Sequence, residues 1–191
     1  MKIFFITSPR IKEKYPENIK KIYDTIQEIG YVHSSNIVQH MDASHFYGSS
    51  TEEMKKNYKE MVEGIKKADI VVFEASMHSL AIGYLLNLTL ENGKPAVVLY
   101  SDNTVAPFLF ENIQNDKLVV ASYNINNVKK VLKEMLDVAG DQIDVRFNFF
   151  VSSKIVTYLD WIARQKKLPR AVYLRRLIEE DMKKNKDFLE E

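Results

Sequence analysis

The sequence predicts an α/β protein built on a five-stranded parallel sheet with helices on both faces. Short apolar runs alternate with segments of helical periodicity five times along the first 140 residues, which is typical of such a sheet. The run at 69–74 (DIVVFE) is almost wholly apolar, as expected for a strand buried on both faces. Turn residues separate the segments, with Ser8-Pro9 after the first run and Gly30 after the first helix.

The expected strands and helices follow one another in a regular order. Strands are expected at 2–7, 31–38, 69–74, 95–100 and 117–122. Helices are expected at 16–29, 51–65, 79–92 and 127–138. The helix at 51–65 carries an apolar stripe at helical spacing, made of Met54, Tyr58, Met61 and Ile65. The helix at 79–92 is apolar nearly all round, so we expect it to be buried.

The pattern changes after 139–141, which suggests a second domain. The run at 145–151 (VRFNFFV) reads as an extended strand, and helices are expected at 154–167 and 170–184. Their inward-facing residues are expected to be Ile155, Leu159, Ile162 and Ala163, then Leu174, Leu177 and Ile178. One strand and two helices cannot bury a core alone, so this segment is expected to pair with its own copy. The predicted domains are therefore 1–140 and 145–184.

Composition excludes several classes of protein. The chain has 191 residues, of which 46% are hydrophobic and 28% charged, so it is globular rather than disordered. The chain has no apolar stretch of about 18 residues, and Met1 leads directly into a strand-like run. We therefore expect a cytoplasmic protein with no membrane partner. Because there is no cysteine, disulfides, thiolate metal sites and a cysteine nucleophile are excluded.

Charge is distributed unevenly, although the formal net charge is only +1. Between 145 and 178 there is one acidic residue, Asp160, against eight basic ones, which are Arg146, Lys154, Arg164, Lys166, Lys167, Arg170, Arg175 and Arg176. Such a cluster is either a solvated face or a surface that meets a polyanion.

The segment at 145–184 resembles the ribbon-helix-helix family of DNA-binding proteins. The resemblance rests on the run RFNFFVS, the helix after it, and KLPRAVYLRRLIEEDMKK. It implies a homodimer through the C-terminal strand, with the paired strands in the major groove of double-stranded DNA. Strand alternation would place Phe147, Phe149 and Val151 in the core, and Arg146, Asn148 and Phe150 on the groove face.

The side chains expected on the groove face differ in how well they suit DNA. Arg146 suits guanine and Asn148 suits adenine. Phe150 replaces the polar residue expected there and suits either a thymine methyl group or a protein partner. Arg170 and the N–H groups at the start of the second helix would meet phosphate. The alternative is a dimerisation tail of the same fold without DNA contact.

The stretch 68–87 (ADIVVFEASMHSLAIGYLLN) is similar to the signature of the nucleoside 2-deoxyribosyltransferase superfamily. Within it, the similarity is greatest to the branch that hydrolyses the N-glycosidic bond of 2'-deoxynucleoside 5'-monophosphates. It covers about 1–138 and implies a flavodoxin-like fold and a nucleotide-like ligand. The positions that match the family's phosphate- and nucleotide-binding residues are Ser8, Arg10, Ser79 and Tyr84. Alternatively, Ser8 is a turn serine, Arg10 a surface arginine and Ser79 a helix cap.

The catalytic carboxylates of that family are missing here. The glutamate expected after Gly83-Tyr84 is Leu85, and the aspartate expected eight residues before Asp69 is Met61. Neither side chain can stabilise an oxocarbenium ion or transfer a proton. Glu74 ends a buried strand at the edge where α/β sites lie, so it is the one candidate for a displaced catalytic residue, against a structural or ribose-binding role.

No metal or cofactor is expected. His40 and His45 are five residues apart, which is not the spacing of a helical metal-binding pair. With only six glycines, the chain has no phosphate-cradling loop of the P-loop or dinucleotide type.

Three hypotheses follow from the sequence. The first is a dimeric DNA-binding regulator with a catalytically silent pocket for a nucleotide-like small molecule. The second is an active N-glycosidase or deoxyribosyltransferase that uses Glu74. The third is an interaction protein with no small ligand, to which the acidic run Glu179–Asp181 lends some support.

Overall fold

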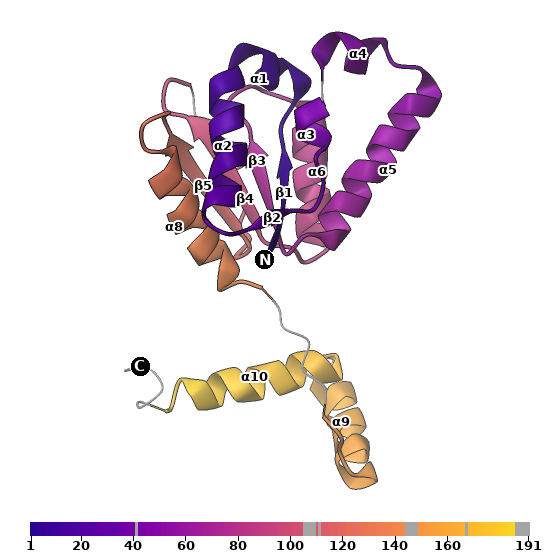
Figure 1. The fold of residues 1–191 in the computed structure, drawn as a ribbon. Coiled ribbons are helices and arrows are strands. Elements are labelled where there is room, and N and C mark those ends of the chain that lie inside the picture. Colours follow the sequence, from indigo (N-terminus) through magenta and orange to yellow (C-terminus); the bar gives the residue numbers. More distant parts are fainter. Residues whose placement is uncertain (41, 105–109, 111, 144–148, 167, 186–191) are drawn as a thin grey trace. The chain divides into compact units, whose positions relative to one another are not determined.

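The computed structural model describes the chain except for residues 41, 105–109, 111, 144–148, 167 and 186–191. It divides into two compact units, unit 1 at Met1–Asp144 and unit 2 at Val145–Glu191 (Figure 1). The strands of unit 1 are β1 (Lys2–Ile6), β2 (Val32–His33), β3 (Ile70–Glu74), β4 (Ala96–Ser101) and β5 (Leu118–Tyr123). Its helices are α1 (Pro9–Lys14), α2 (Pro16–Glu28), α3 (Ile37–His40), α4 (Ala43–Gly48), α5 (Thr51–Lys67), α6 (Leu80–Glu91) and α8 (Val128–Gly140). Unit 2 contains α9 (Ser153–Lys166) and α10 (Arg170–Met182).

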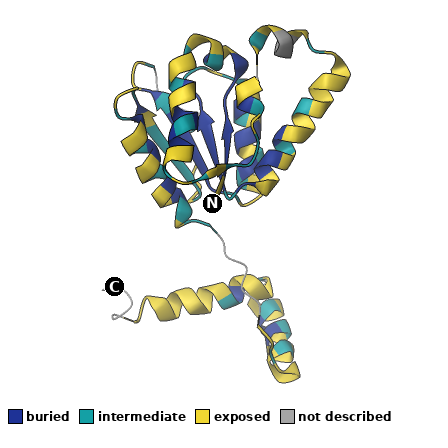
Figure 2. Ribbon diagram, viewed as in Figure 1, coloured by how far each residue is buried: buried dark blue, intermediate teal, exposed yellow. Residues whose placement is uncertain are grey.

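The predicted α/β fold with a five-stranded parallel sheet is confirmed. Within the described residues, the strands are ordered β2-β1-β3-β4-β5, and every neighbouring pair is parallel. Side chains alternate along β1, so that Ile3 and Phe5 pack under α2 and α8 while Phe4 and Ile6 pack under α5 and α6. Strands β1, β3 and β4 are accordingly largely buried, β5 is mostly half-buried, and the outer faces of the helices are exposed (Figure 2).

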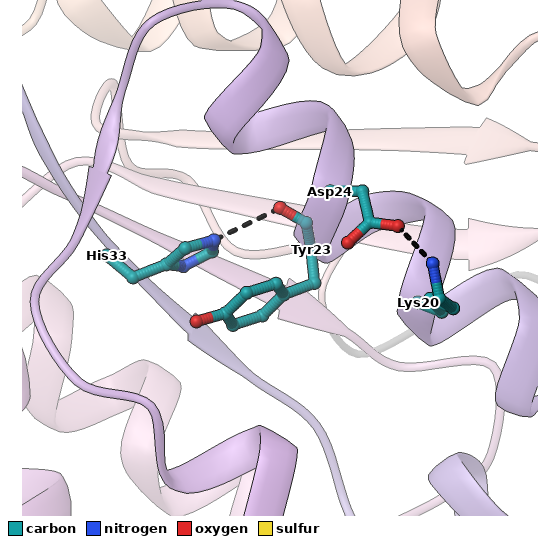
Figure 3. A network of polar contacts seen from close by, with 4 residues as sticks. All are labelled: Lys20, Tyr23, Asp24 and His33. Carbon is teal, nitrogen blue, oxygen red and sulfur yellow. Dashed lines mark hydrogen bonds and ion pairs between the residues drawn. The ribbon is translucent and has the colours of Figure 1, made fainter.

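A ring stack joins α2 to the edge strand β2. The Tyr23 and His33 rings lie 3.7 Å apart at an interplanar angle of 8°. His33 Nε2 donates a hydrogen bond of 3.1 Å to the Tyr23 backbone carbonyl (Figure 3). On the exposed side of the same helix, Lys20 forms an ion pair with Asp24 at 2.6 Å.

Two expectations for the N-terminal half were wrong. The strand expected at 31–38 shrinks to β2, because this edge strand pairs only through Val32 and His33 before the chain turns into α3. The Ser8-Pro9 turn is instead the start of α1, since the Ser8 hydroxyl accepts a hydrogen bond from the Ile11 N–H at 3.3 Å. A serine N-cap followed by proline is also a helix-start pattern.

Helix α6 is buried on one face rather than all round. Ile82, Leu85 and Leu86 pack on the sheet, whereas Leu80 is 94% exposed and Tyr84 about half exposed. The stripe on α5 divides in the same way, with Met61 and Ile65 buried but Met54 and Tyr58 exposed. Hydrophobic periodicity therefore overestimated how much of each helix reaches the core.

Unit 2 buries fewer residues than its periodicity predicts. Its core consists of Leu159, Ile162 and Tyr173, with Leu174 packed against it. The expected inward residues Ile155, Leu177 and Ile178 are exposed, because two helices meet along a single line of contact. The expected strand is not observed at Phe149–Val151, and 145–148, with Arg146, Phe147 and Asn148, lie outside the described residues. Because the expected strand would pair with the same strand of a second chain, one chain alone has no partner strand for its backbone hydrogen bonds.

None of the helices in the described ranges is both long enough and apolar enough to span a membrane.

Candidate functional site

The carboxyl edge of the sheet has a topological switch point between β1 and β3. From β1 the chain passes to β2 on one side, while β3 lies on the other, and ligands of open α/β sheets bind in such crevices. Ile6 is in register with Phe73, so the residues after β1 lie beside the end of β3. The Thr7 hydroxyl donates to the backbone carbonyl of Glu74 at 3.5 Å, which ties the two strand ends together.

Glu74 is fully buried at this edge, and three donors meet its carboxylate. The Ser76 hydroxyl and the Tyr123 hydroxyl both donate to Oε1, the second at 3.1 Å, and the Ser76 N–H donates to Oε2 at 3.4 Å. Burial raises the pKa of Glu74 above its ordinary value, and the bonds from Ser76 and Tyr123 oppose that shift only in part. Glu74 therefore holds its proton at a higher pH than an exposed glutamate does.

The donors to Glu74 are themselves held by other elements. The Asn18 amide of α2 donates to the Tyr123 hydroxyl at 3.3 Å, and the Ser101 N–H at the end of β4 donates to Ser76 Oγ at 2.8 Å. Burial, and then the nearby Glu74 charge, raise the pKa of Tyr123, so its hydroxyl remains a donor. The result is one connected polar network over the ends of β3, β4 and β5.

Sequence reasoning found Glu74 but missed the rest of this network, which consists of Asn18, Ser76, Ser101 and Tyr123. A signal for two of them was present, because Ser101 and Tyr123 are the polar residues that end β4 and β5. The carboxyl ends of parallel strands meet at one edge. Asn18 lies on α2, about a hundred residues from Tyr123, and no local pattern indicates that contact.

The predicted phosphate-binding residues occupy helix starts and surfaces. Ser8 caps α1, and Ser79 caps α6 through its hydroxyl, which accepts from the Ile82 N–H at 3.4 Å. Arg10 is exposed on α1. Tyr84 is exposed on α6, where its hydroxyl is 2.9 Å from that of Tyr58. The fold brings Ser8 to the same edge as Glu74, whereas Tyr84 pairs with α5.

The two positions at which the resembling family has carboxylates are part of the apolar core. Met61 of α5 and Leu85 of α6 are both buried in the cluster that contains Phe4 and Ile6 of β1. A carboxylate at either position would have to be taken out of water among aliphatic and aromatic side chains.

Of the predicted DNA-contacting residues, Phe150 and Arg170 belong to the described part of unit 2. Phe150 is fully exposed. Arg170 begins α10, and its guanidinium forms an ion pair with Asp160 of α9. The other described cations on the two helices are exposed, and they are Lys154, Arg164, Lys166, Arg175 and Arg176.

Among the residues that the structure describes, no group of three or more His, Asp or Glu side chains is arranged to hold a metal ion.

Among the comparisons with known proteins, only the comparison with solved structures finds a likeness. No protein-family model matches the chain, and no curated protein matches it. Among solved structures, the chain is similar to the CMP N-glycosidase BcmB of Clostridium botulinum, with 16% identity and a TM-score of 0.48. The match covers 72% of this chain and 99% of that one.

Proposed function

We propose that the chain is a dimeric DNA-binding regulator whose unit 1 binds a nucleotide-like ligand without cleaving it. The observation that carries the proposal is the surface of unit 2, where hydrophobic and cationic side chains are exposed side by side on two short helices. Binding of a nucleotide-like ligand without cleavage is supported by two features of unit 1. It retains Ser8, Arg10 and Ser79, and it lacks the two carboxylates.

The apolar surface of unit 2 supports dimerisation. Among its described residues, three apolar side chains are buried and nine large ones are exposed. The exposed ones are Phe149, Phe150, Ile155, Tyr158, Trp161, Val172, Leu177, Ile178 and Met182. A segment of this size cannot sustain its fold with so small a core, and exposed apolar surface on this scale marks an interface. Because the ribbon-helix-helix resemblance implies a two-chain fold, the partner we propose is a second copy.

The cations of unit 2 support contact with DNA. Lys154, Arg164, Arg175 and Arg176 are exposed, and dimerisation would double their number on one assembly. Cations of this kind bind phosphates and release counterions, so the affinity should fall steeply with salt. Arg170 forms an ion pair with Asp160, so only part of its guanidinium group is available to a phosphate.

The test of DNA binding is anisotropy of the full chain with duplexes selected from a random library. The Arg175→Glu, Arg176→Glu double variant should weaken binding at least tenfold. It should also reduce the slope of the logarithm of the binding constant against the logarithm of the salt concentration, by about 0.9 for each phosphate contact that is lost. The matched control, Lys55→Glu with Lys56→Glu, makes the same charge change on exposed α5 and should bind as the wild type does. Equal loss in both variants, or no selected duplex at all, would contradict the proposal.

The silent pocket is supported by the burial of Met61 and Leu85 in the apolar core. Its test is proton NMR of the full chain with the four 2'-deoxynucleoside monophosphates over one day. We expect broadened nucleotide signals without free base. Unchanged sharp signals for all four would instead favour an interaction protein without a small ligand.

One observation favours a second candidate, an N-glycosidase that uses Glu74. A buried carboxyl group with a raised pKa is what a general acid requires near neutral pH. In that case free base would appear in the NMR experiment, and Glu74→Gln would abolish its release. Base release that persists undiminished in Glu74→Gln would eliminate this candidate.

A further inference from the structure

A cavity lies at the carboxyl edge of the sheet, and neither Ser8 nor Ser79 is among the described residues that line it. It has a volume of about 420 Å³ and opens over the ends of β4 and β5, beside the first turn of α2. Its polar lining consists of Asn18, Ser101, Asp102, Asn103, Asn124 and Asn126. A cavity of this size lies within the range of small-ligand sites.

The chemistry of the lining selects one class of ligand. Among the described residues that line it, there are four amides, two hydroxyls (Ser101 and Tyr15) and one carboxylate, and none is a lysine or arginine. A phosphate would meet the negative charge of Asp102, and no cation among these lining residues would offset it. Amides both donate and accept, and a carboxylate accepts from adjacent hydroxyls, so the lining suits an uncharged ligand with several hydroxyl groups. Tyr15 and Ile125 supply apolar wall for its C–H faces.

Asn124 makes part of this lining rigid. Its Oδ1 accepts from the N–H groups of Asn126 and Asn127, both at 3.0 Å, and its Nδ2 donates to Asp102 Oδ2 at 2.8 Å. The Asp102 N–H in turn donates to the Tyr123 carbonyl at 2.9 Å. These bonds position the Asp102 carboxylate and, among the described residues, leave its Oδ1 for a ligand.

The amides of Asn103 and Asn126 are the groups available for recognition. Within the described part of the chain, neither side-chain amide is hydrogen-bonded to protein, and both residues are exposed at the cavity. Asn18 differs, because its Nδ2 already donates to Tyr123 at 3.3 Å, which leaves its Oδ1 to accept from a ligand hydroxyl. Asn18 thereby connects the cavity to the Glu74 network.

We propose that this cavity binds a neutral polyhydroxylated ligand of pentose size, held by Asp102 and the amides of Asn103, Asn126 and Asn18. The site does not depend on DNA binding or on a nucleotide at Ser8 and Ser79. It also predicts selectivity, because adding a phosphate to the same sugar brings a dianion to a cavity whose described lining carries only negative charge.

The experiment titrates the full ¹⁵N-labelled chain with D-ribose and methyl β-D-ribofuranoside and follows the side-chain amide signals. We expect saturable shifts of the Asn103 and Asn126 amides with one common Kd. Ribose 5-phosphate should bind these residues more weakly than ribose. Absence of saturable shifts for both sugars, or tighter binding of the phosphate at the same amides, overturns the proposal.

Two substitutions in the lining test whether ribose binds in this cavity. Asn103→Ala should weaken ribose binding about threefold to tenfold through loss of one neutral hydrogen bond. Asp102→Asn should weaken it about tenfold or more, because a charge-assisted bond is lost while the contact with Asn124 can be kept. Asp116→Asn is the matched control, exposed before the start of β5 at the opposite edge, and should bind as the wild type does. Unchanged affinity in both cavity variants would place the sugar elsewhere and overturn the proposal.

Discussion

His33 illustrates how one partly buried side chain sets a pH dependence. Its Nε2 donates to the Tyr23 carbonyl, so the neutral ring carries its proton on Nε2, while the buried Nδ1 has no partner among the residues that the structure describes. Burial lowers the pKa of His33 below its ordinary value of 6.5, although the bond to Tyr23 opposes this shift. The folded chain therefore favours the neutral ring, and the unfolded chain binds a proton more readily.

We predict that His33 destabilises the fold as the pH falls through about 6.5 toward its lowered pKa. His33→Phe keeps a ring against Tyr23 and removes the titration. At pH 7.5 its free energy of unfolding should lie within about 1 kcal/mol of the wild type, since one hydrogen bond and one unpaired nitrogen are lost together. At pH 5.0 the free energy of unfolding of the variant, compared with that of the wild type, should be more favourable than it is at pH 7.5. Urea unfolding followed by far-UV circular dichroism measures both values, and parallel pH profiles would contradict the prediction.

Glu74 produces the opposite dependence. Its raised pKa means that the folded chain binds the proton more tightly than the unfolded chain above about pH 4.5. Its contribution to stability is thus fully present below that pH and is lost as the pH rises through the raised pKa. We predict that Glu74→Gln gains stability relative to the wild type between pH 4.5 and pH 8, because the amide cannot ionise. Urea unfolding at both pH values tests this, and a difference that shrinks with rising pH would contradict it.

At the scale of the element, the packing of α5 on β1 depends on one glycine. A Cβ at Gly64 would lie 2.7 Å from both Cε1 and Cζ of Phe4, a ring that is completely buried in the core. The ring has no free space to move into, so the helix would have to shift away from the sheet.

We predict that Gly64→Ala destabilises unit 1 by about 1–2 kcal/mol, even though alanine is the better helix former. Gly83→Ala on α6 is the matched control, since nothing lies within 4 Å of its added Cβ. That variant should gain about 0.5–1 kcal/mol from helix propensity and reduced freedom of the unfolded chain. Chemical denaturation of both proteins measures the difference. A stabilised Gly64→Ala protein would show that this contact is looser than the structure indicates.

The elements that the sequence predicted well are those with buried, local patterns. Strands β1, β3, β4 and β5 match their expected ranges closely, because each is an apolar run in a sheet covered on both sides. The edge strand at 31–38 was foreseen, but its shortening to the two residues of β2 was not, and neither were the short helices α1, α3 and α4, since a few residues of pairing or capping decide them. For the candidate site, Glu74 was foreseen because it ends an apolar run. Its partners Tyr123 and Asn18 were not, because that contact is long-range.

At the scale of the whole molecule, the two units differ in how much of their apolar surface a single chain can bury. Unit 1 buries its sheet between two helical layers, whereas unit 2 leaves most of its large apolar side chains in water among the residues described. The same difference explains why periodicity predicted Leu177 and Ile178 as buried. In the dimer that we propose, a second copy of unit 2 would supply the surface that covers these two side chains.

We predict that the protein has twice the 22.2 kDa mass of the chain in solution and that unit 2 holds the dimer together. Leu177→Glu with Ile178→Glu places two charges on this surface and should give the mass of one chain by sedimentation equilibrium. Val138→Glu is the control, because Val138 is a half-exposed apolar residue on α8 of unit 1, and its dimer should persist. Trp161 is half exposed in one chain, so its emission should shift to longer wavelength in the double variant only. A wild-type protein with the mass of one chain at tens of micromolar would leave these side chains exposed and would contradict the proposed dimeric regulator.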